Sequence, residues 1–257
     1  TTHDLLLEVC MAAKYEGNSI NTPYPKHEQT NKDSQICTVL ARSFADIGDI
    51  VRGRDLFLGN DKEKEKRKQL DDKLKDIFKK IHDNLVKKNV AEELQERYGS
   101  DKDPNYYQLR EDWWALNRQD VWKALTCDAH GNRYFRPTCI DGQSGAQAKN
   151  KCTCNNGDVP TYFDYVPQYL RWFEEWAEDF CRLRKHKLKD AKQQCRGKDK
   201  GGKKLYCDLN RYDCERTASG KHDFFEDDDC KDCQYSCSRF VNWIDNQKLE
   251  FLKQKNK

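Results

Sequence analysis

Apolar side chains recur every three to four residues along most of this chain of 257 residues, which is the spacing of amphipathic helices rather than of strands. The clearest repeat covers residues 70–85 and consists of Leu70, Leu74, Ile77, Phe78, Ile81 and Leu85. Residues 61–68, just before it, alternate in charge (DKEKEKRK). We interpret them as the solvated start of the same helix.

The same spacing predicts further helices over residues 5–15, from Ile36 onward, over 106–125, from Pro167 to about Gln194, and over 238–254. Proline suits a first helical position, because the N–H that it lacks needs no partner there. The sequence predicts loops at residues 21–25 (NTPYP) and at the glycine-containing stretch 127–154. Strand signals are scarce, so the predicted fold class is all-α.

Three aromatic blocks lie within these predicted helices: Tyr106-Tyr107, Trp113-Trp114, and Trp172-Phe173 with Trp176. A ligand stacked on exposed rings is one interpretation, and a packed core is the other. Aromatic residues at helical spacing are more often core residues, where each ring buries a large area. We therefore interpret the three blocks as core.

Thirteen cysteines are many for a chain that is 36% hydrophobic and 35% charged. Such a number indicates disulfides, which cross-link a modest core and persist outside the reducing cytosol. The disulfide candidates are Cys10, Cys37, Cys127, Cys139, Cys152, Cys154, Cys181, Cys195, Cys207, Cys214, Cys230, Cys233 and Cys237. Because thirteen is odd, at least one cysteine is free or pairs outside this chain.

Metal binding and catalysis find little support in the sequence. Cys230, Cys233 and Cys237, with His222 nearby, have a metal-like spacing, but zinc needs four ligands and no second suitable pair is present. The six histidines have no nucleophile motif beside them. The chain contains no phosphate-binding glycine loop, no G-x-S-x-G and no H-E-x-x-H. We expect no metal, no cofactor and no enzymatic activity.

No apolar run approaches the length of about 20 residues that crosses a bilayer. The chain starts at Thr1 without a methionine and stops at Lys257, inside a lysine-rich helical stretch. We interpret it as a piece of a longer protein.

Residues 181–204 are strongly basic, with eleven Lys and Arg against two Asp, a net charge of +9. The candidate anion-binding residues are Arg182, Arg184, Lys185, Lys187, Lys189, Lys192, Arg196, Lys198 and Lys200. Lys185, Lys189 and Lys192 would share one face of a helix. Such a face suits a sulfated glycan, nucleic acid or anionic lipid, and the alternative is a solvated helix end that leads into a flexible loop. An extracellular setting favours a glycan, and we expect no nucleic acid.

The charge distribution also predicts a boundary near Phe180, between a helical body and a smaller, cysteine-dense helical part.

Three strings in this chain are specific to one family. Residues 41–50 (ARSFADIGDI), 109–114 (LREDWW) and 164–176 (DYVPQYLRWFEEW) resemble the Duffy-binding-like adhesion domains of the variant erythrocyte membrane proteins of the malaria parasite, Plasmodium falciparum. Residues 121–127 (VWKALTC), the pair Cys152 and Cys154, and residues 171–181 resemble the alpha class of these domains. The resemblance covers nearly the whole chain.

The resemblance implies an all-α, disulfide-cross-linked fold in three subdomains. Residues 1–35 would end the first, 36–180 would form the helical second, and 181–257 would form a cysteine-rich third that is truncated at its C-terminus. The disulfides implied are Cys37–Cys154, Cys10–Cys127 and Cys139–Cys152. The partners of Cys230 and Cys237 would lie beyond Lys257.

The resemblance also implies a function in cell adhesion. Such a domain lies on the extracellular face of the infected host erythrocyte membrane and reaches the membrane only through a distant transmembrane segment outside this stretch. Its implied partners are a host cell-surface receptor, or a sulfated (heparan sulfate) or blood-group glycan, and the adjacent cysteine-rich interdomain region. Four cysteines between the landmarks 46–49 and 167–170 resemble the non-rosetting subgroup. The alternative is a structural spacer and antigenically variable surface that supports a neighbouring receptor-binding domain.

Overall fold

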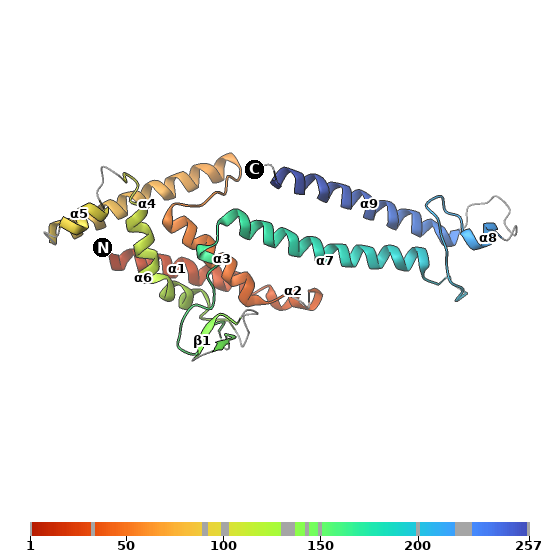
Figure 1. The fold of residues 1–257 in the computed structure, drawn as a ribbon, viewed down its shortest axis with the longest axis horizontal. Coiled ribbons are helices and arrows are strands. Elements are labelled where there is room, and N and C mark those ends of the chain that lie inside the picture. Colours follow the sequence, from red (N-terminus) through yellow and green to blue (C-terminus); the bar gives the residue numbers. More distant parts are fainter. Residues whose placement is uncertain are drawn as a thin grey trace. The chain divides into compact units, whose positions relative to one another are not determined.

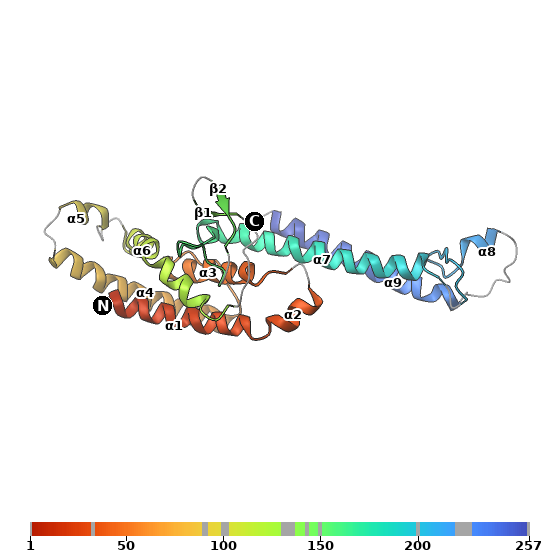
Figure 2. The same ribbon diagram turned by 90° about the horizontal axis from the view of Figure 1, so that it is seen from below.

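The computed structural model describes residues 2–31, 34–88, 92–98, 103–129, 137–141, 144–148, 151–198, 201–218 and 228–255 (Figures 1 and 2). Its helices are α1 (Thr2–Asn21), α2 (Tyr24–Thr30), α3 (Ile36–Arg52), α4 (Asp61–Lys88), α5 (Glu92–Tyr98), α6 (Tyr107–Leu125), α7 (Gln168–Arg196), α8 (Cys214–Ala218) and α9 (Asp228–Lys255), with a 3₁₀ turn η1 (Phe163–Tyr165). Two short strands, β1 (Cys139–Asp141) and β2 (Ser144–Ala146), pair antiparallel. The predicted all-α class is confirmed.

The predicted helices are all present, but three of the predicted bounds differ. The first helix was predicted over residues 5–15, whereas α1 runs from Thr2 to Asn21. Residues 21–25 were predicted as a loop, whereas Pro25 stands within the first turn of α2, where a proline is tolerated. α9 begins at Asp228, ten residues before the predicted start at Ser238. Its extra turns carry Cys230 and Cys233, which are buried in disulfides, so covalent cross-links rather than an apolar repeat hold this segment.

The chain divides into two compact units, unit 1 (residues 1–171) and unit 2 (residues 172–257). The predicted boundaries lay at 35/36 and at 180/181. In the structure, α1 packs against α3 and α6 within the core of unit 1. The assignment of residues 1–35 to the end of a first subdomain stays a prediction.

The core of unit 1 is built on aromatic rings from α3 and α6. The ring centroid of Phe44 lies 5.1 Å from those of Trp114 and Trp122, and all three side chains are fully buried. Gly48 permits this packing, because a Cβ there would lie 2.8 Å from the Trp114 ring. The core interpretation of the Trp113-Trp114 block is therefore confirmed.

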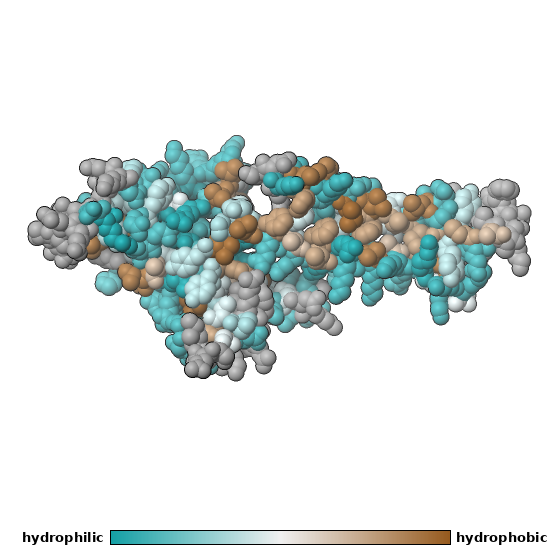
Figure 3. All heavy atoms as spheres, viewed as in Figure 1, coloured by the Kyte–Doolittle hydropathy of each residue, from teal (hydrophilic) through white to brown (hydrophobic). Residues whose placement is uncertain are grey.

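Unit 2 is organised around α7 and α9, which run side by side in opposite directions (Figures 1 and 2). Aromatic rings form their seam: Phe180 stacks on Trp243 with centroids 5.4 Å apart, and Trp176 stacks on Phe180 at 5.6 Å. Trp172 and Phe173, however, are 37% and 39% exposed, so the core interpretation was wrong for these two. Figure 3 shows hydrophobic atoms along the surface of α7 and α9. A pair of helices has too little volume to enclose rings of this size.

Within the described residues, four disulfides are present: Cys37–Cys152, Cys139–Cys154, Cys195–Cys233 and Cys207–Cys230. The implied pairs Cys37–Cys154 and Cys139–Cys152 are wrong, since the two partners are exchanged. Cys152 has φ +52°, in the left-handed region, and this turn directs Cys152 to α3 and Cys154 to β1.

The implied bridge Cys10–Cys127 is also absent. Burial, with a smaller contribution from the Asp120 carboxylate, raises the pKa of the Cys10 thiol. Burial and a hydrogen bond to Asp128 raise the pKa of Cys127, and Lys14, one turn after Cys10, lowers it. Cys10 lies within α1, and Cys127 lies two residues after the last residue of α6.

Cys230 pairs with Cys207, so its implied partner beyond Lys257 is wrong. Among the described residues, the cysteines without a disulfide are Cys10, Cys127, Cys181, Cys214 and Cys237.

Replacing the fully buried Leu40 with alanine removes a side chain from the centre of unit 1. We expect Leu40→Ala to lower the free energy of unfolding by about 2–5 kcal/mol, because it leaves a cavity. The matched control is Leu116→Ala, whose side chain is 84% exposed and whose loss should change stability by less than about 0.5 kcal/mol. Urea denaturation of the oxidised chain measures both, and equal effects would contradict this core.

Peptide mapping of the non-reduced chain tests the cross-links. We expect a fragment that joins Cys37 to Cys152 and another that joins Cys139 to Cys154, because these are the pairs that the backbone turn at Cys152 selects. Fragments that join Cys37 to Cys154 would show that the turn is placed wrongly.

Candidate functional site

The exposed side of α7 carries the basic face, defined here as Lys185, Lys189 and Lys192. These side chains are exposed at intervals of four and three residues, so they follow one line along the helix. Lys189 and Lys192 form no ion pair with any described residue. Arg184 is exposed beside this line. The structure thus brings four of the nine predicted anion-binding residues together.

The other predicted residues have different surroundings. Arg182 forms an ion pair with Asp179 at 2.8 Å. Arg196 donates hydrogen bonds to the carbonyl oxygens of Cys195 (2.8 Å) and Cys207 (2.7 Å), so it holds the chain between two disulfides. Lys198 forms a β-bridge with Lys204 at the base of a loop. Lys200 lies outside the described residues.

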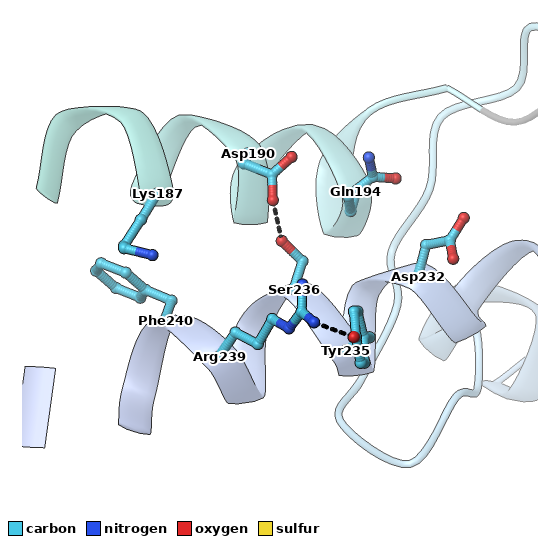
Figure 4. Close-up of a pocket in the computed structure, with 8 residues that line it drawn as sticks. All are labelled: Lys187, Asp190, Gln194, Asp232, Tyr235, Ser236, Arg239 and Phe240. Carbon is cyan, nitrogen blue, oxygen red and sulfur yellow. Dashed lines mark hydrogen bonds between the residues drawn. The ribbon is translucent and has the colours of Figure 1, made fainter. Parts of the chain in front are cut away.

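Lys187 faces α9 rather than the basic face. Its Nζ lies 5.7 Å from the centroid of the Trp243 ring, a cation–π distance. It also lines the seam pocket, a cavity of about 260 Å³ between α7 and α9 (Figure 4).

The seam pocket is lined by residues of α7 and α9, the two long helices of unit 2, at helical spacing. α7 contributes Lys187, Asp190 and Gln194, and α9 contributes Asp232, Tyr235, Ser236, Arg239 and Phe240. The Ser236 hydroxyl donates a hydrogen bond to Asp190 across the seam (Figure 4). The Arg239 guanidinium stacks on the Tyr235 ring at 3.9 Å and donates to its hydroxyl.

Sequence reasoning singled out only Lys187 among the residues of the seam pocket. For the others, apart from the apolar Phe240, the signal is a polar side chain at every third or fourth position of α7 and α9. That signal acquires meaning only once the pairing of α7 with α9 is known, because polar residues at this spacing otherwise indicate a solvated face.

No group of three or more His, Cys, Asp or Glu in the described part of the chain is arranged to hold a metal ion. Cys230 and Cys233 belong to separate disulfides and therefore offer no thiolates. His222 lies outside the described residues. Among the described helices, none is long and apolar enough to cross a membrane.

The first turn of α7 is fixed within unit 1 by the arginine network, defined as Arg52, Arg118 and Arg171 with Asp46, Asp49 and Asp164. Arg171 pairs with Asp46 at 2.7 Å and with Asp49 at 2.6 Å. Arg52 pairs with the same Asp49 at 2.8 Å. Burial raises the pKa of the Asp49 carboxyl above its ordinary value, while the hydrogen bond and charge of Arg171 oppose this rise.

Asp164 is the second acidic centre of the arginine network. Its fully buried carboxylate accepts hydrogen bonds from the Arg118 guanidinium (2.7 Å) and from the Trp114 indole N–H (3.0 Å). Arg52 also donates to the Asp164 carbonyl oxygen. Burial, the largest single influence, lowers the pKa of Arg118, but the hydrogen bonds that Arg118 donates to Asp164 and the Asp164 charge raise this pKa above its ordinary value. Ion pairs and hydrogen bonds of Asp164 therefore join α3, α6 and η1 to one another.

Comparison with known proteins decides the family. The Duffy binding domain profile matches residues 1–171, and the profile of the Duffy-binding-like domain, C-terminal subdomain, matches residues 175–257. The chain belongs to the Duffy-binding-like family. The two matched regions separate where the structure divides into unit 1 and unit 2.

Solved structures of Duffy-binding-like domains agree with this assignment. The chain is 43% identical to the NTS-DBL1(alpha-1) domain of the Plasmodium falciparum membrane protein 1 (PfEMP1) from the varO strain, over 98% of this chain and 54% of that one, with a TM-score of 0.72. It is 42% identical to the NTS-DBL1-alpha and CIDR-gamma double domain of the same strain, over 98% and 34%, with a TM-score of 0.70. The predicted resemblance to the alpha class is confirmed.

A third Duffy-binding-like structure is the PfEMP1 IT4var13 DBLbeta domain bound to ICAM-1. The chain is 30% identical to it over 98% of this chain and 50% of that one, with a TM-score of 0.64. The chain thus spans about half or less of the length of these solved chains. No curated protein matches it.

Asp164→Asn tests the arginine network of this Duffy-binding-like domain. The amide that replaces one carboxylate oxygen is a donor, and it would face donors from Arg118 and Trp114. We expect the free energy of unfolding to fall by about 3–5 kcal/mol, the cost of breaking a buried charge pair.

The control for Asp164→Asn is Asp120→Asn, which removes the carboxylate of an exposed pair with Lys123 on the same helix. Exposed pairs contribute about 0–1 kcal/mol. Thermal unfolding of both variants, with the four disulfides intact, is the measurement. A small loss for Asp164→Asn would mean that the network does not hold unit 1 together.

Proposed function

We propose that this chain is a receptor-binding adhesion domain of a PfEMP1-type variant surface antigen, displayed on the outer face of the infected erythrocyte. It binds an anionic glycan of host-cell receptors through the basic face of α7. The observation that carries the glycan assignment is the line of exposed lysines in which Lys189 and Lys192 have no ion-pair partner among the described residues.

The electrostatics of α7 support this assignment. Residues 181–204 carry a net charge of +9 in a chain whose total is only +3, so the positive potential is concentrated in one segment. Concentrated charge of one sign attracts a polyanion and speeds its association. Because the lysines are exposed, the attraction weakens with salt beyond a screening length of about 8 Å at physiological ionic strength.

Adhesion of this kind needs complementary charge on a rigid element and no chemical step. α7 provides such an element, since its first turn is held by Arg171 and its last by the Cys195–Cys233 disulfide. A relative of the same family is a DBLbeta domain bound to ICAM-1, which supports direct receptor binding as a property available to this fold.

The second candidate is a structural role, in which this domain supports a neighbouring receptor-binding domain and presents a variable surface. The double-domain relative, which joins a DBL1-alpha domain to a CIDR-gamma domain, favours it. The two candidates differ in one measurable property: the oxidised chain alone binds host cells in the first and does not in the second.

Charge reversal of the basic face tests the proposal. We expect the triple variant Lys185→Glu, Lys189→Glu and Lys192→Glu to lose at least about tenfold in affinity for immobilised heparin. Three exposed cation contacts of up to about 1 kcal/mol each become repulsive in this variant. The salt concentration of elution from a heparin column measures the change.

The control reverses three exposed lysines of α4 (Lys62, Lys66 and Lys73), which alternate with acidic residues. This variant should elute close to the unmodified chain. An equal fall in the eluting salt concentration for the two variants would show that heparin binding depends only on the net charge of the chain. Unchanged elution of the α7 variant would exclude the basic face, and absent binding of the oxidised chain to host cells would favour the structural role.

A further inference from the structure

The seam pocket places four charged side chains around one cavity without pairing them. Lys187 and Arg239 are cationic, Asp190 and Asp232 are anionic, and no ion pair joins these four described residues. Opposite charges at a surface usually neutralise each other where the geometry allows it. Here the helices hold them apart. Ser236 binds one oxygen of Asp190 and Tyr235 accepts one N–H of Arg239, and the remaining donors and acceptors of the four side chains are available to a ligand.

Arg239 is the best-prepared group in the seam pocket. Its guanidinium lies 3.9 Å from the centroid of the Tyr235 ring and donates to the Tyr235 hydroxyl. Stacking fixes the plane of the guanidinium and leaves further N–H groups of the fork free. A planar fork held in this way suits a carboxylate or a sulfate, because two parallel N–H···O bonds can form.

Lys187 adds a second positive charge at the aromatic end of the cavity. Its Nζ lies 5.7 Å from the Trp243 ring, and Figure 4 shows the side chain beside Phe240. The lysine is partly buried and has no carboxylate partner among the described residues. An anion bound beside Lys187 and Arg239 would therefore meet two cations and one apolar ring, while the Asp190 carboxylate, which also lines the pocket and is bound by Ser236, would oppose it.

The other end of the seam pocket offers uncharged and acidic hydrogen-bonding groups. Figure 4 places Gln194 and Asp232 there, on opposite helices. A carboxylate accepts hydrogen bonds from hydroxyl groups, and an amide both donates and accepts. The cavity is thus cationic and aromatic at one end and able to bind hydroxyl groups at the other.

We propose that the seam pocket binds one anionic sugar residue, a pyranose that carries a single carboxylate or sulfate group. Arg239 and Lys187 hold the anion, Phe240 contacts the apolar face of the ring, and Asp232 and Gln194 bind its hydroxyl groups. A volume of about 260 Å³ lies below the range of about 300–1,000 Å³ that is typical of drug-sized ligands, so a single ring fits better than a longer chain.

The inference rests on the proposed adhesion function for its biological meaning, but the site is physically separate from the basic face. Lys189 and Lys192 are exposed and do not line the cavity. The basic face senses the summed charge of a polyanion, whereas the seam pocket recognises one residue by its shape.

The test uses the oxidised chain and three small probes, with binding followed by NMR chemical-shift titration. Methyl glucuronide carries a carboxylate, N-acetylglucosamine 6-sulfate carries a sulfate, and methyl glucoside is the neutral match of the first. We expect at least one anionic probe to bind about tenfold more tightly than methyl glucoside, since a charge-assisted hydrogen bond contributes that much. The two anionic arms distinguish a uronate source from a sulfated one.

Arg239→Gln and Lys187→Gln identify the site, and Lys192→Gln is the matched control, because it removes one cation of α7 outside the cavity. We expect either pocket variant to lose the preference for the anionic probe, and the control to retain it. Arg239→Lys keeps the positive charge but not the planar fork, so its preference for the anionic probe should lie between those of the unmodified chain and of Arg239→Gln. Since Arg239 is exposed and Lys187 only partly buried, the variants should fold.

Three results would overturn the inference: no binding of either anionic probe, equal binding of methyl glucoside, or full binding by Arg239→Gln. N-acetylglutamate serves as a fourth probe, and tighter binding of it than of methyl glucuronide would assign the pocket to an acidic protein side chain instead. This test and the heparin test of the proposed function can fail independently. The basic face can fail to bind heparin while the seam pocket still binds its sugar, and the seam pocket can fail to bind a sugar while the basic face still binds heparin.

Discussion

The arginine network is the constraint that fixes how α3, α6, η1 and the first turn of α7 meet within unit 1. Asp49 forms ion pairs with both Arg52 and Arg171, and Asp164 forms an ion pair with Arg118. A buried ion pair adds little net stability over an apolar contact, but it strongly disfavours arrangements that leave one charge unpaired. The network therefore specifies which ends of α3, α6, η1 and α7 meet, while the aromatic core around Phe44 supplies the stabilising energy.

This network gives a physical meaning to the family's sequence strings. Residues 41–50 contribute Phe44, Gly48 and Asp49, residues 109–114 contribute Trp114, and residues 164–176 contribute Asp164 and Arg171. Trp114 links them, because its ring packs on Gly48 and its N–H binds Asp164. Strings that lie far apart in the sequence thus form one contact set, which is why a chain that resembles the family in all three has the family's fold.

The sequence predicted what local pattern controls and missed what distant contacts control. Long apolar repeats gave α1, α3, α4, α6 and most of α7 and α9. The exchanged partners of Cys37 and Cys139 depend on a left-handed backbone turn at Cys152, which no glycine or asparagine marks in the sequence. In the candidate site, composition located the basic segment, but the direction of each side chain follows from the pairing of α7 with α9. That pairing turns Lys187 inward and leaves Lys189 and Lys192 outside.

Cross-linking explains why unit 2 can keep an open polar pocket between its two long helices. Two helices that relied on burial alone would need an apolar seam along their whole length. In unit 2 the rings of Phe180 and Trp243 join the helices at one level, and the Cys195–Cys233 disulfide joins them covalently at another. The helical turns between these two levels, where Ser236 donates a hydrogen bond to Asp190, are not needed to hold the two helices together by apolar packing. Because the helices are joined above and below this level, the polar residues that line the seam pocket need not form an apolar seam there.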